Sequence, residues 1–336
     1  MKRTTIRDVA RQAGVGLMTV SRVLNGNKNV TQKTERKVRA AMLRVGYRPN
    51  EAARMLKGRA SKTIGLLAPY LDEFFGACFH AVQEVAASEG YMTLVGASER
   101  KGAQELDQAR EMMSRSVAGL LIATSNGTSE AYAGAEFAGC PIVAFDRPLN
   151  RADVDSVLAE NRGGTREAVE HLIEHGHKHI LCIGFDAAAY TVQERIAGYI
   201  DAMRNAGLKP EVHDALETAE SIKQLIAHKW QSKRRPTAVF TTQYLSSVNT
   251  VNAVMQQGLQ IPRDIALIGF DDIKLAQVLH SPLTTVAQSA EEIGRRSAEM
   301  LFSRLRSENE GEHATSRGTK IVFPTRLVIR NSCGCK

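Results

Sequence analysis

The first fifty residues carry apolar side chains at helical spacing. Behind Thr5, a suitable N-cap residue, they recur at Ile6, Val9, Ala10 and Ala13, which predicts a first helix of about two turns. Gly14 and Gly16 then allow a tight turn before a second helix from Leu17. The apolar face of this second helix is formed by Val20, Val23 and Leu24, and polar residues lie outside that face at Thr19, Ser21, Arg22 and Asn25.

A third helix is predicted over about residues 32–45, where apolar residues face inward and basic residues stay outside. Three such helices can close a small core, and the second helix of a helix-turn-helix enters the major groove of DNA. Pro49 ends the third helix, and Asn50 can cap a helix over residues 51–57 that is too short to be stable alone. We therefore expect this segment to become ordered only with a partner.

From Thr63 onward, apolar runs alternate with helical stretches, at intervals of about twenty to thirty residues. The runs are TIGLLAP, YMTLVGA, AGLLIAT, PIVAFDR, HILCIGF, TAVFTTQ and DIALIGF. This alternation is typical of strand–helix units around a parallel sheet. Two similar halves follow one another, each with a strand, a polar loop and a long helix. The sequence thus predicts an α/β core of two doubly wound lobes with a cleft between them.

Charge divides the chain into the same two parts. Residues 1–62 hold sixteen Lys or Arg and three acidic residues, a net charge of +13. The rest of the chain holds 28 Lys or Arg and 33 acidic residues, a net charge of −5. A solvated basic tail would lack helical periodicity, so this segment is interpreted as a surface that meets a polyanion. The first seven residues are polar and basic, with no apolar run behind them. This favours neither a signal peptide nor a membrane span and predicts a cytoplasmic protein.

The cysteines lie in mostly apolar settings, which favours free thiols in a reducing compartment; they are Cys78, Cys140, Cys182, Cys333 and Cys335. The terminal Cys333-Gly334-Cys335 lacks a second ligand pair at a recognised spacing for a metal. His171 and His175 lie four residues apart on one helix face, but Gly176 ends that helix, so the histidines that follow are expected to point elsewhere. We expect no metal site and no cofactor.

Residues 4–68 resemble the lactose-repressor and purine-repressor family of bacterial transcription regulators. The matching segments are TIRDVARQAGV, TVSRVLNG, VTQKTERKV, GYRPNEAARMLK and TIGLL, and the similarity continues through the whole chain. The resemblance implies an all-α helix-turn-helix DNA-binding domain over residues 1–49 and a hinge helix and linker over residues 50–62. Residues 63–336 would form an effector-binding and dimerisation core similar to periplasmic sugar-binding proteins. Its N-lobe would take about residues 63–160 plus 290–320, and its C-lobe about residues 161–289 plus 321–336.

The resemblance also implies which residues contact DNA. Base edges would be read by Leu17, Met18 and Arg22, and phosphates would be held by Thr5, Thr19, Ser21, Asn25 and Thr31. The family often has polar residues where Leu17 and Met18 stand; the apolar side chains can pack against a thymine methyl, or fold back onto the small core and contact no base. The hinge would enter the minor groove through Ala53, Arg54, Leu56 and Lys57. Leu56 would wedge between base pairs; the alternative is an ordinary buried leucine.

In open α/β sheets, ligands bind beyond the carboxyl ends of the strands. Candidates there are Phe74, Phe75, Asp146, Arg147, Arg195, Asp271 and Gln288, of which the resemblance implies effector contacts for Phe75, Arg147, Arg195 and Asp271. Aromatic faces with charged groups suit a sugar or sugar acid. The alternatives are core packing for the two phenylalanines, an Asp146–Arg147 ion pair, and a helix cap by Asp271 with Asp272. Gln243-Tyr244 stands where the family commonly has Asn-Asp, which alters one wall of the pocket.

These observations favour a DNA-binding transcriptional regulator, expected to be a repressor. It would bind a pseudo-palindromic double-stranded operator as a homodimer, under the control of a small molecule. The C-terminal segment has no apolar heptads, which argues against a coiled-coil tetramer. A solute-binding protein of a transporter is a second hypothesis, and the basic segment and missing signal peptide count against it. An enzyme is a third, but the sequence contains no GxxxxGKS, GxSxG or HExxH motif.

Overall fold

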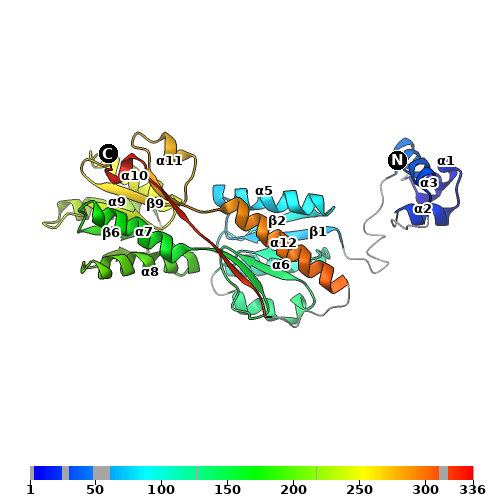
Figure 1. The fold of residues 1–336 in the computed structure, drawn as a ribbon, viewed down its shortest axis with the longest axis horizontal. Helices are drawn as coiled ribbons and strands as arrows, with labels where there is room; N and C mark the ends of the chain where they lie inside the picture. Colours follow the sequence, from blue (N-terminus) through cyan, green and yellow to red (C-terminus); the bar gives the residue numbers. More distant parts are fainter. Residues whose placement is uncertain are drawn as a thin grey trace. The chain divides into compact units, whose positions relative to one another are not determined.

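A computed structural model of the chain describes residues 4–24, 30–47, 61–125, 128–216, 218–309 and 317–335. These residues belong to two units, residues 1–61 and residues 62–336 (Figure 1). The predicted hinge contacts Ala53, Arg54, Leu56 and Lys57 lie outside the described residues, as does Asn25. Within the described ranges, every helix is too short or too polar to span a lipid bilayer.

The first unit contains the three helices that the apolar spacing predicted: α1 (Ile6–Ala13), α2 (Leu17–Leu24) and α3 (Gln32–Arg44). Thr5 is the N-cap of α1, as predicted, and its backbone N–H and hydroxyl donate to the Asp8 carboxylate at 2.9 and 2.7 Å. Gly14 ends α1 with a φ of +57°, a conformation that glycine adopts at little cost. The helices enclose a small core of Val9, Ala13, Val20, Val23, Val38 and Ala41.

The N-lobe of the second unit is a parallel sheet with the strand order β11-β5-β4-β3-β1-β2. Helices lie on both of its faces, and two short 3₁₀-helices, Ser129–Ala133 and Ala135–Phe137, precede β4. Its elements are β1 (Thr63–Ala68), α5 (Glu73–Ser88), β2 (Met92–Ala97), α6 (Gly102–Ser114), β3 (Leu120–Ile122), β4 (Ile142–Phe145), β5 (Asp155–Ala159), α12 (Ala290–Asn309) and β11 (Lys320–Phe323).

The C-lobe repeats this topology with the order β12-β10-β9-β8-β6-β7, in which only β12 runs antiparallel to its neighbour among the described strands. Each sheet places its first strand between its second and third, so both lobes are doubly wound, as predicted. The elements of the C-lobe are α7 (Asn161–Glu174), β6 (Ile180–Ile183), α8 (Tyr190–Asn205), β7 (Val212–His213), α9 (Ala219–Gln231), β8 (Ala238–Thr241), α10 (Tyr244–Gln256), β9 (Ala266–Phe270), α11 (Leu275–Val278), β10 (Thr284–Ala287), β12 (Arg326–Val328) and the 3₁₀-helix η3 (Asn331–Cys333).

Three segments of the chain cross between the lobes: from β5 to α7, from β10 to α12, and from β11 to β12 (Figure 1). The third crossing follows Phe323, a few residues later than the lobe boundary expected near residue 320. The reason is that β11 pairs with β5 from Lys320 opposite Ser156 to Phe323 opposite Ala159. This parallel pairing keeps the whole segment in the N-lobe sheet.

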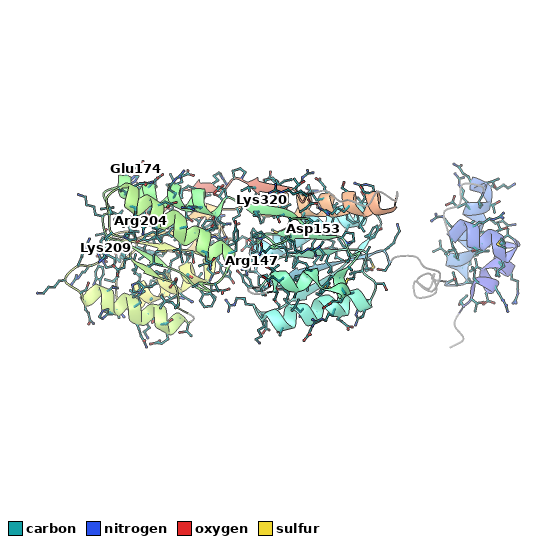
Figure 2. The ribbon with its side chains drawn as sticks, turned by 90° about the horizontal axis from the view of Figure 1, so that it is seen from below. Arg147, Asp153, Glu174, Arg204, Lys209 and Lys320 are labelled. Atoms are coloured by element: carbon teal, nitrogen blue, oxygen red, sulfur yellow. The ribbon has the colours of Figure 1, made fainter. Side chains whose placement is uncertain are left out.

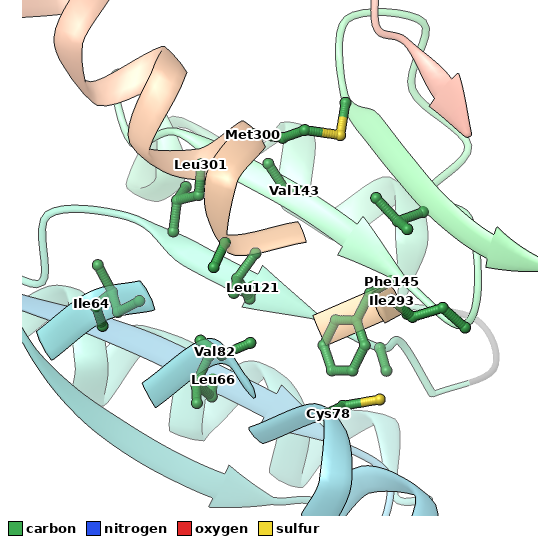
Figure 3. Packing of buried hydrophobic residues seen from close by; sticks show 14 of the residues in the cluster. Ile64, Leu66, Cys78, Val82, Leu121, Val143, Phe145, Ile293, Met300 and Leu301 are labelled. Carbon is green, nitrogen blue, oxygen red and sulfur yellow. The ribbon is translucent and has the colours of Figure 1, made fainter. Parts of the chain in front are cut away.

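Two helices, α5 and α12, pack side by side on one face of the N-lobe sheet (Figures 1 and 3). A Cβ atom on Gly294 of α12 would lie 2.2 Å from the carbonyl oxygen of Cys78 in α5, so glycine is needed for this close approach. The side chains buried between sheet and helices include Ile64, Leu66, Val82, Leu121, Val143, Ile293 and Leu301.

Replacing Gly294 by alanine will therefore destabilise the core unit. Because the new methyl group overlaps the backbone of α5, we expect the free energy of unfolding to fall by at least about 1–3 kcal/mol. Urea denaturation measures this change from the transition midpoint. Gly76 of α5 is the matched control, since no atom lies within 4 Å of a Cβ there. Alanine at Gly76 should raise stability by roughly 0.5–1 kcal/mol, and equal effects of the two substitutions would contradict this packing.

Candidate functional site

A cavity lies between the two lobes, at the carboxyl ends of their strands. The free space between its lining side chains is small, and Figure 2 shows Arg147, which adjoins it, at the junction of the lobes. Six of the seven predicted effector residues line it, which places them together as the strand-end rule predicted. The lining residues are Tyr70, Asp72, Phe74, Phe75 and Asp146 from the N-lobe, and Thr191, Arg195, Asp271 and Gln288 from the C-lobe.

Arg147, the seventh predicted residue, is buried but is not among the residues that line the cavity. Its Nε donates to Asp146 Oδ2 at 3.3 Å, and its Nη1 donates to the carbonyl oxygen of Thr124 at 3.2 Å. The ion pair between Asp146 and Arg147 that the sequence allowed is therefore present. Arg147 compensates the charge of Asp146 without itself lining the cavity.

Asp146 and Asp271 occupy equivalent places in the two lobes. Each directly follows the fourth strand of its lobe, β4 or β9. Both have a positive φ, +62° for Asp146 and +74° for Asp271. Non-glycine residues adopt this left-handed conformation at a cost, and they are concentrated at functional sites. The duplicated turn brings one carboxylate from each lobe to the cavity.

Arg195 of α8 is a buried cation with several partners in the C-lobe. Its Nε donates to Asn161 Oδ1 and its Nη1 donates to the carbonyl oxygen of Thr242, each at 2.7 Å. Its guanidinium lies over the ring of Phe270, 3.6 Å from the centroid, and 3.8 Å from the Asp271 carboxylate. These contacts fix the guanidinium at the cavity surface, where it can donate further hydrogen bonds.

Gln288, which directly follows β10, holds Asp271 in place. Its Nε2 donates a hydrogen bond of 2.6 Å to Asp271 Oδ1. Its Oε1 is buried and has no hydrogen-bond partner among the described residues. A buried acceptor without a partner costs free energy, so a hydroxyl group on a bound ligand would find a ready acceptor here.

Aromatic side chains form the N-lobe wall of the cavity. Phe75 is fully buried, and its ring packs edge-on against Tyr70, Phe74 and Phe145 at centroid distances of 5.3, 5.1 and 5.9 Å. Phe75 is thus a core residue of the N-lobe as well as part of the cavity lining. Phe74 is half-buried and presents a more accessible apolar surface.

Asp72 is a cavity residue that the sequence analysis missed. It is the N-cap of α5 and accepts a hydrogen bond of 2.9 Å from the backbone N–H of Phe75, so its cap position was the available signal. Burial raises the pKa of Asp72 to about 6, and the carboxylates of Asp271 and Asp146 add to this rise, while the Phe75 N–H opposes it. Burial also raises the pKa of Asp146, against the lowering effect of Arg147 and Arg195.

Other predicted roles change with the structure. Tyr70 and Thr191 line the cavity although no sequence pattern marked them. Asp272 does not act as a helix cap with Asp271; it pairs with Arg330, whose Nη1 lies 2.6 Å from Asp272 Oδ1. The unusual Gln243-Tyr244 pair lines a neighbouring hollow that also includes Tyr70, Asp72 and Arg100.

In the first unit, the N-terminal turn of α2 presents apolar side chains to solvent. Leu17 is 46% exposed and Met18 is 70% exposed, and neither belongs to the small core. The alternative that both side chains fold back is therefore wrong. Arg22 on the same helix is also exposed, and Thr19 and Ser21 are half-buried.

Two of the predicted phosphate contacts are helix caps. Thr5 precedes α1, and Thr31 caps α3 by accepting a hydrogen bond of 3.3 Å from the N–H of Thr34. Both threonines are exposed. The amino ends of helices carry free N–H groups and a partial positive charge, which suit a phosphate group.

A helix-turn-helix unit followed in one chain by a two-lobed unit, with charged and aromatic residues gathered between the lobes, is the architecture of a DNA-binding regulator that senses a small molecule. Comparison with protein families agrees in both parts. Residues 5–50 match the bacterial regulatory proteins of the lacI family. Residues 169–333 match a periplasmic binding protein-like domain.

Full-length relatives establish the family. The chain is 32% identical to the HTH-type transcriptional regulator DegA of Bacillus subtilis, with 98% of each protein covered. It is 31% identical to the HTH-type transcriptional repressor PurR of Pasteurella multocida, again with 98% of each covered. It is 30% identical to the repressor CytR of Escherichia coli, covering 98% of this chain and 96% of CytR. The chain belongs to the lacI family of bacterial regulatory proteins and is a transcriptional regulator, not an enzyme.

Solved structures confirm the predicted fold class. A lac repressor dimer bound to operator and the anti-inducer ONPF superposes with a TM-score of 0.84, at 27% identity and 99% coverage of both chains. The complex of the transcriptional regulator CelR with cellobiose has a TM-score of 0.70, at 27% identity, and covers 98% of this chain and 100% of that one.

The raised pKa of Asp72 predicts a specific pH dependence of stability. Because the folded protein holds the Asp72 proton more tightly than the unfolded chain does, this contribution to stability is complete below pH 3.8 and is lost as the pH rises through about 6. An asparagine side chain in its place would be uncharged at every pH and could still cap α5. We expect Asp72→Asn to gain stability relative to the wild type between about pH 4 and pH 7.

Urea unfolding of both proteins at a series of pH values measures this difference. Asp264→Asn is the control, because the hydrogen bond from Arg263 lowers the pKa of that half-buried carboxyl instead of raising it. A difference between wild type and Asp72→Asn that stays constant from pH 4.5 to pH 7.5, roughly the span over which such a group titrates, would rule out a raised pKa at Asp72.

Proposed function

We propose that this regulator represses transcription by binding a pseudo-palindromic operator as a homodimer, and that a sugar or sugar acid in the interlobe cavity controls its affinity for DNA. The observation that carries the proposal is the cavity itself, where carboxylates from both lobes, the aromatic rings of the N-lobe and the buried arginine of the C-lobe converge. A ligand held by both lobes favours one relative arrangement of them, and it shifts DNA affinity by its differential affinity for the two states.

The chemistry of the cavity suits a small polyhydroxylated ligand. The carboxylates of Asp72, Asp146 and Asp271 accept hydrogen bonds from hydroxyl groups, and the free Oε1 of Gln288 adds another acceptor. Arg195 can donate to a ring oxygen or to the carboxylate of a sugar acid. The aromatic wall covers the apolar face that a sugar ring presents.

For the DNA end, the exposure of α2 supports base reading by its first turn. Leu17 and Met18 are accessible for contact with thymine methyl groups, and Arg22 is accessible for paired hydrogen bonds to guanine. The polar residues around them would hold phosphates and fix the orientation of the helix. These residues are Thr5, Thr19, Ser21, Asn25 and Thr31.

A second contact would be made by the hinge segment. We propose that Ala53, Arg54, Leu56 and Lys57 enter the minor groove, where Leu56 unstacks one base step and two hinge segments meet across the dimer axis. The similar lac repressor structure contains a dimer bound to operator, which supports a two-fold complex. The proposed place of action is the cytoplasm, where the chain would meet both chromosomal DNA and its effector.

The proposed division between base and phosphate contacts can be tested by substitution. Arg22→Ala should relax the base preference at one position of each half-site by about 1–3 kcal/mol. Thr19→Ala should instead weaken binding to all sequences alike, because a phosphate contact carries no sequence information. Binding to a randomised operator library, sequenced after selection at a fixed salt concentration, measures both effects. Uniform weakening by Arg22→Ala would make it a phosphate contact.

The proposed effector site can be tested by thermal shift with a panel of sugars, sugar acids and purines. A ligand present at a hundredfold excess over its Kd stabilises the folded protein by about 2.7 kcal/mol. Arg195→Lys and Asp271→Asn should abolish most of this stabilisation, because both alter groups that face the cavity. The control is Arg204→Ala, an exposed position on the same helix as Arg195. A stabilising ligand that is indifferent to the first two changes must bind elsewhere.

A further inference from the structure

The C-terminal segment of the chain lies against α7 and the C-lobe sheet. Cys333, at the end of η3, is buried in the C-lobe core. Its Sγ accepts from Thr284 Oγ1 at 3.2 Å and donates to the carbonyl oxygen of Arg330 at 3.3 Å. This anchoring places Cys335, two residues further on, at the C-terminal end of α7.

At that end of α7, two motifs that the sequence analysis weighed separately lie together. His171 and His175 are one helical turn apart, with ring centroids separated by 4.4 Å. Cys335 Sγ lies 3.0 Å from His171 Nε2 and 3.2 Å from His175 Nε2. The three atoms lie within 4.8 Å of one another. The second ligand pair that the Cys-Gly-Cys motif lacked in sequence is therefore supplied by the fold.

The separations are close to those of a metal site. Zinc bonds of about 2.0 Å to nitrogen and about 2.3 Å to sulfur place the two ligand atoms roughly 3.5 Å apart at tetrahedral angles. The nitrogen–sulfur distances here, 3.0 and 3.2 Å, are about 0.3–0.5 Å shorter than this value. To admit the ion, Cys335 must therefore move slightly away from both histidines.

Hydrogen bonding orients His175 as a ligand. Its Nδ1 lies 2.8 Å from the backbone carbonyl oxygen of His171, which can only accept, so Nδ1 carries the proton and Nε2 presents a lone pair towards Cys335. A backbone carbonyl in this position is the usual outer partner of a metal-bound histidine.

We propose that His171 Nε2, His175 Nε2 and Cys335 Sγ bind a zinc ion. The thiol of Cys335 gives up its proton to solvent as the zinc–sulfur bond forms, and both imidazoles bind as neutral groups. Cys333 Sγ lies 3.2 Å from Cys335 Sγ, but it is also hydrogen-bonded to Thr284 and Arg330 in the core, so water is the fourth ligand. Nitrogen and sulfur ligands of this kind select zinc over magnesium or calcium.

The site is separate from the interlobe cavity. Figure 2 shows Glu174, the last residue of α7, at the end of the C-lobe remote from Arg147. Asn161, the first residue of the same helix, holds Arg195 at the cavity. Zinc would therefore fasten the end of the chain to the helix whose other end positions an effector-binding residue.

The test uses the full-length protein under reducing conditions, loaded with zinc or with cobalt(II) as a spectroscopic substitute. The wild type should bind one ion per chain, and the cobalt form should show a thiolate-to-cobalt charge-transfer band. Cys335→Ser should abolish that band. His175→Ala should weaken binding by at least about a hundredfold, because losing a ligand exceeds the 10–100-fold effect of losing an outer partner.

The matched controls are substitutions of a histidine and a cysteine outside the cluster. His177→Ala and Cys140→Ser should leave stoichiometry and spectrum unchanged, since neither residue belongs to the cluster. Zinc should raise the melting temperature of the wild type but not that of Cys335→Ser, which also shows whether the variant folds. The proposal is overturned if the charge-transfer band survives Cys335→Ser. It is also overturned if the wild type binds no more zinc than the His171→Ala/His175→Ala double variant.

Discussion

The buried guanidinium of Arg195 is the interaction on which the interlobe cavity depends. With almost no solvent exposure, this cation must be compensated by the protein, because an unpaired buried charge is strongly destabilising. Its partners are the Asn161 side chain, the Thr242 carbonyl, the Phe270 ring and the nearby Asp271 carboxylate. They come from the start of α7, the end of β8 and the end of β9. The guanidinium of Arg195 thus holds three segments of the C-lobe in place around the cavity. Gln288, at the end of β10, is linked to them through its hydrogen bond to Asp271.

The same residues lie at the places where the chain crosses between the lobes. Asn161 begins α7 just after β5 ends in the N-lobe, and Gln288 stands between β10 and α12. A ligand that binds Asp271 or Arg195 would therefore act on partners located at two of the three crossings. Because the lobes are duplicates, Asp146 brings an equivalent carboxylate from the opposite side. Binding of a ligand in this cavity can therefore be coupled to the relative position of the two lobes. Such coupling is what a population shift between two arrangements of the lobes requires.

The helix-turn-helix unit follows a different constraint. Its core is only a few side chains deep, and Val9, Val20 and Val38 already fill its centre. Leu17 and Met18, in the first turn of α2, lie outside this core and remain in solvent. An apolar surface at the start of a helix that also exposes Arg22 is costly in isolation, and it is accounted for if these side chains contact apolar groups in the major groove.

By itself, the sequence determined the local structure and the class of protein. The Thr5 cap, the helices after it and the succession of strands followed from residues a few positions apart, and such short-range patterns are what periodicity and capping report. The rule that ligands bind beyond the carboxyl ends of strands also predicted most of the residues that line the cavity. Only the tertiary structure decided that Arg147 is not among the residues lining the cavity, that Asp72 is, and that Cys335 meets His171 across 164 residues of sequence. Those contacts depend on strand order and on how helices pack against the sheets, which arise from the summed burial of many distant side chains and leave no mark in any short stretch of the chain.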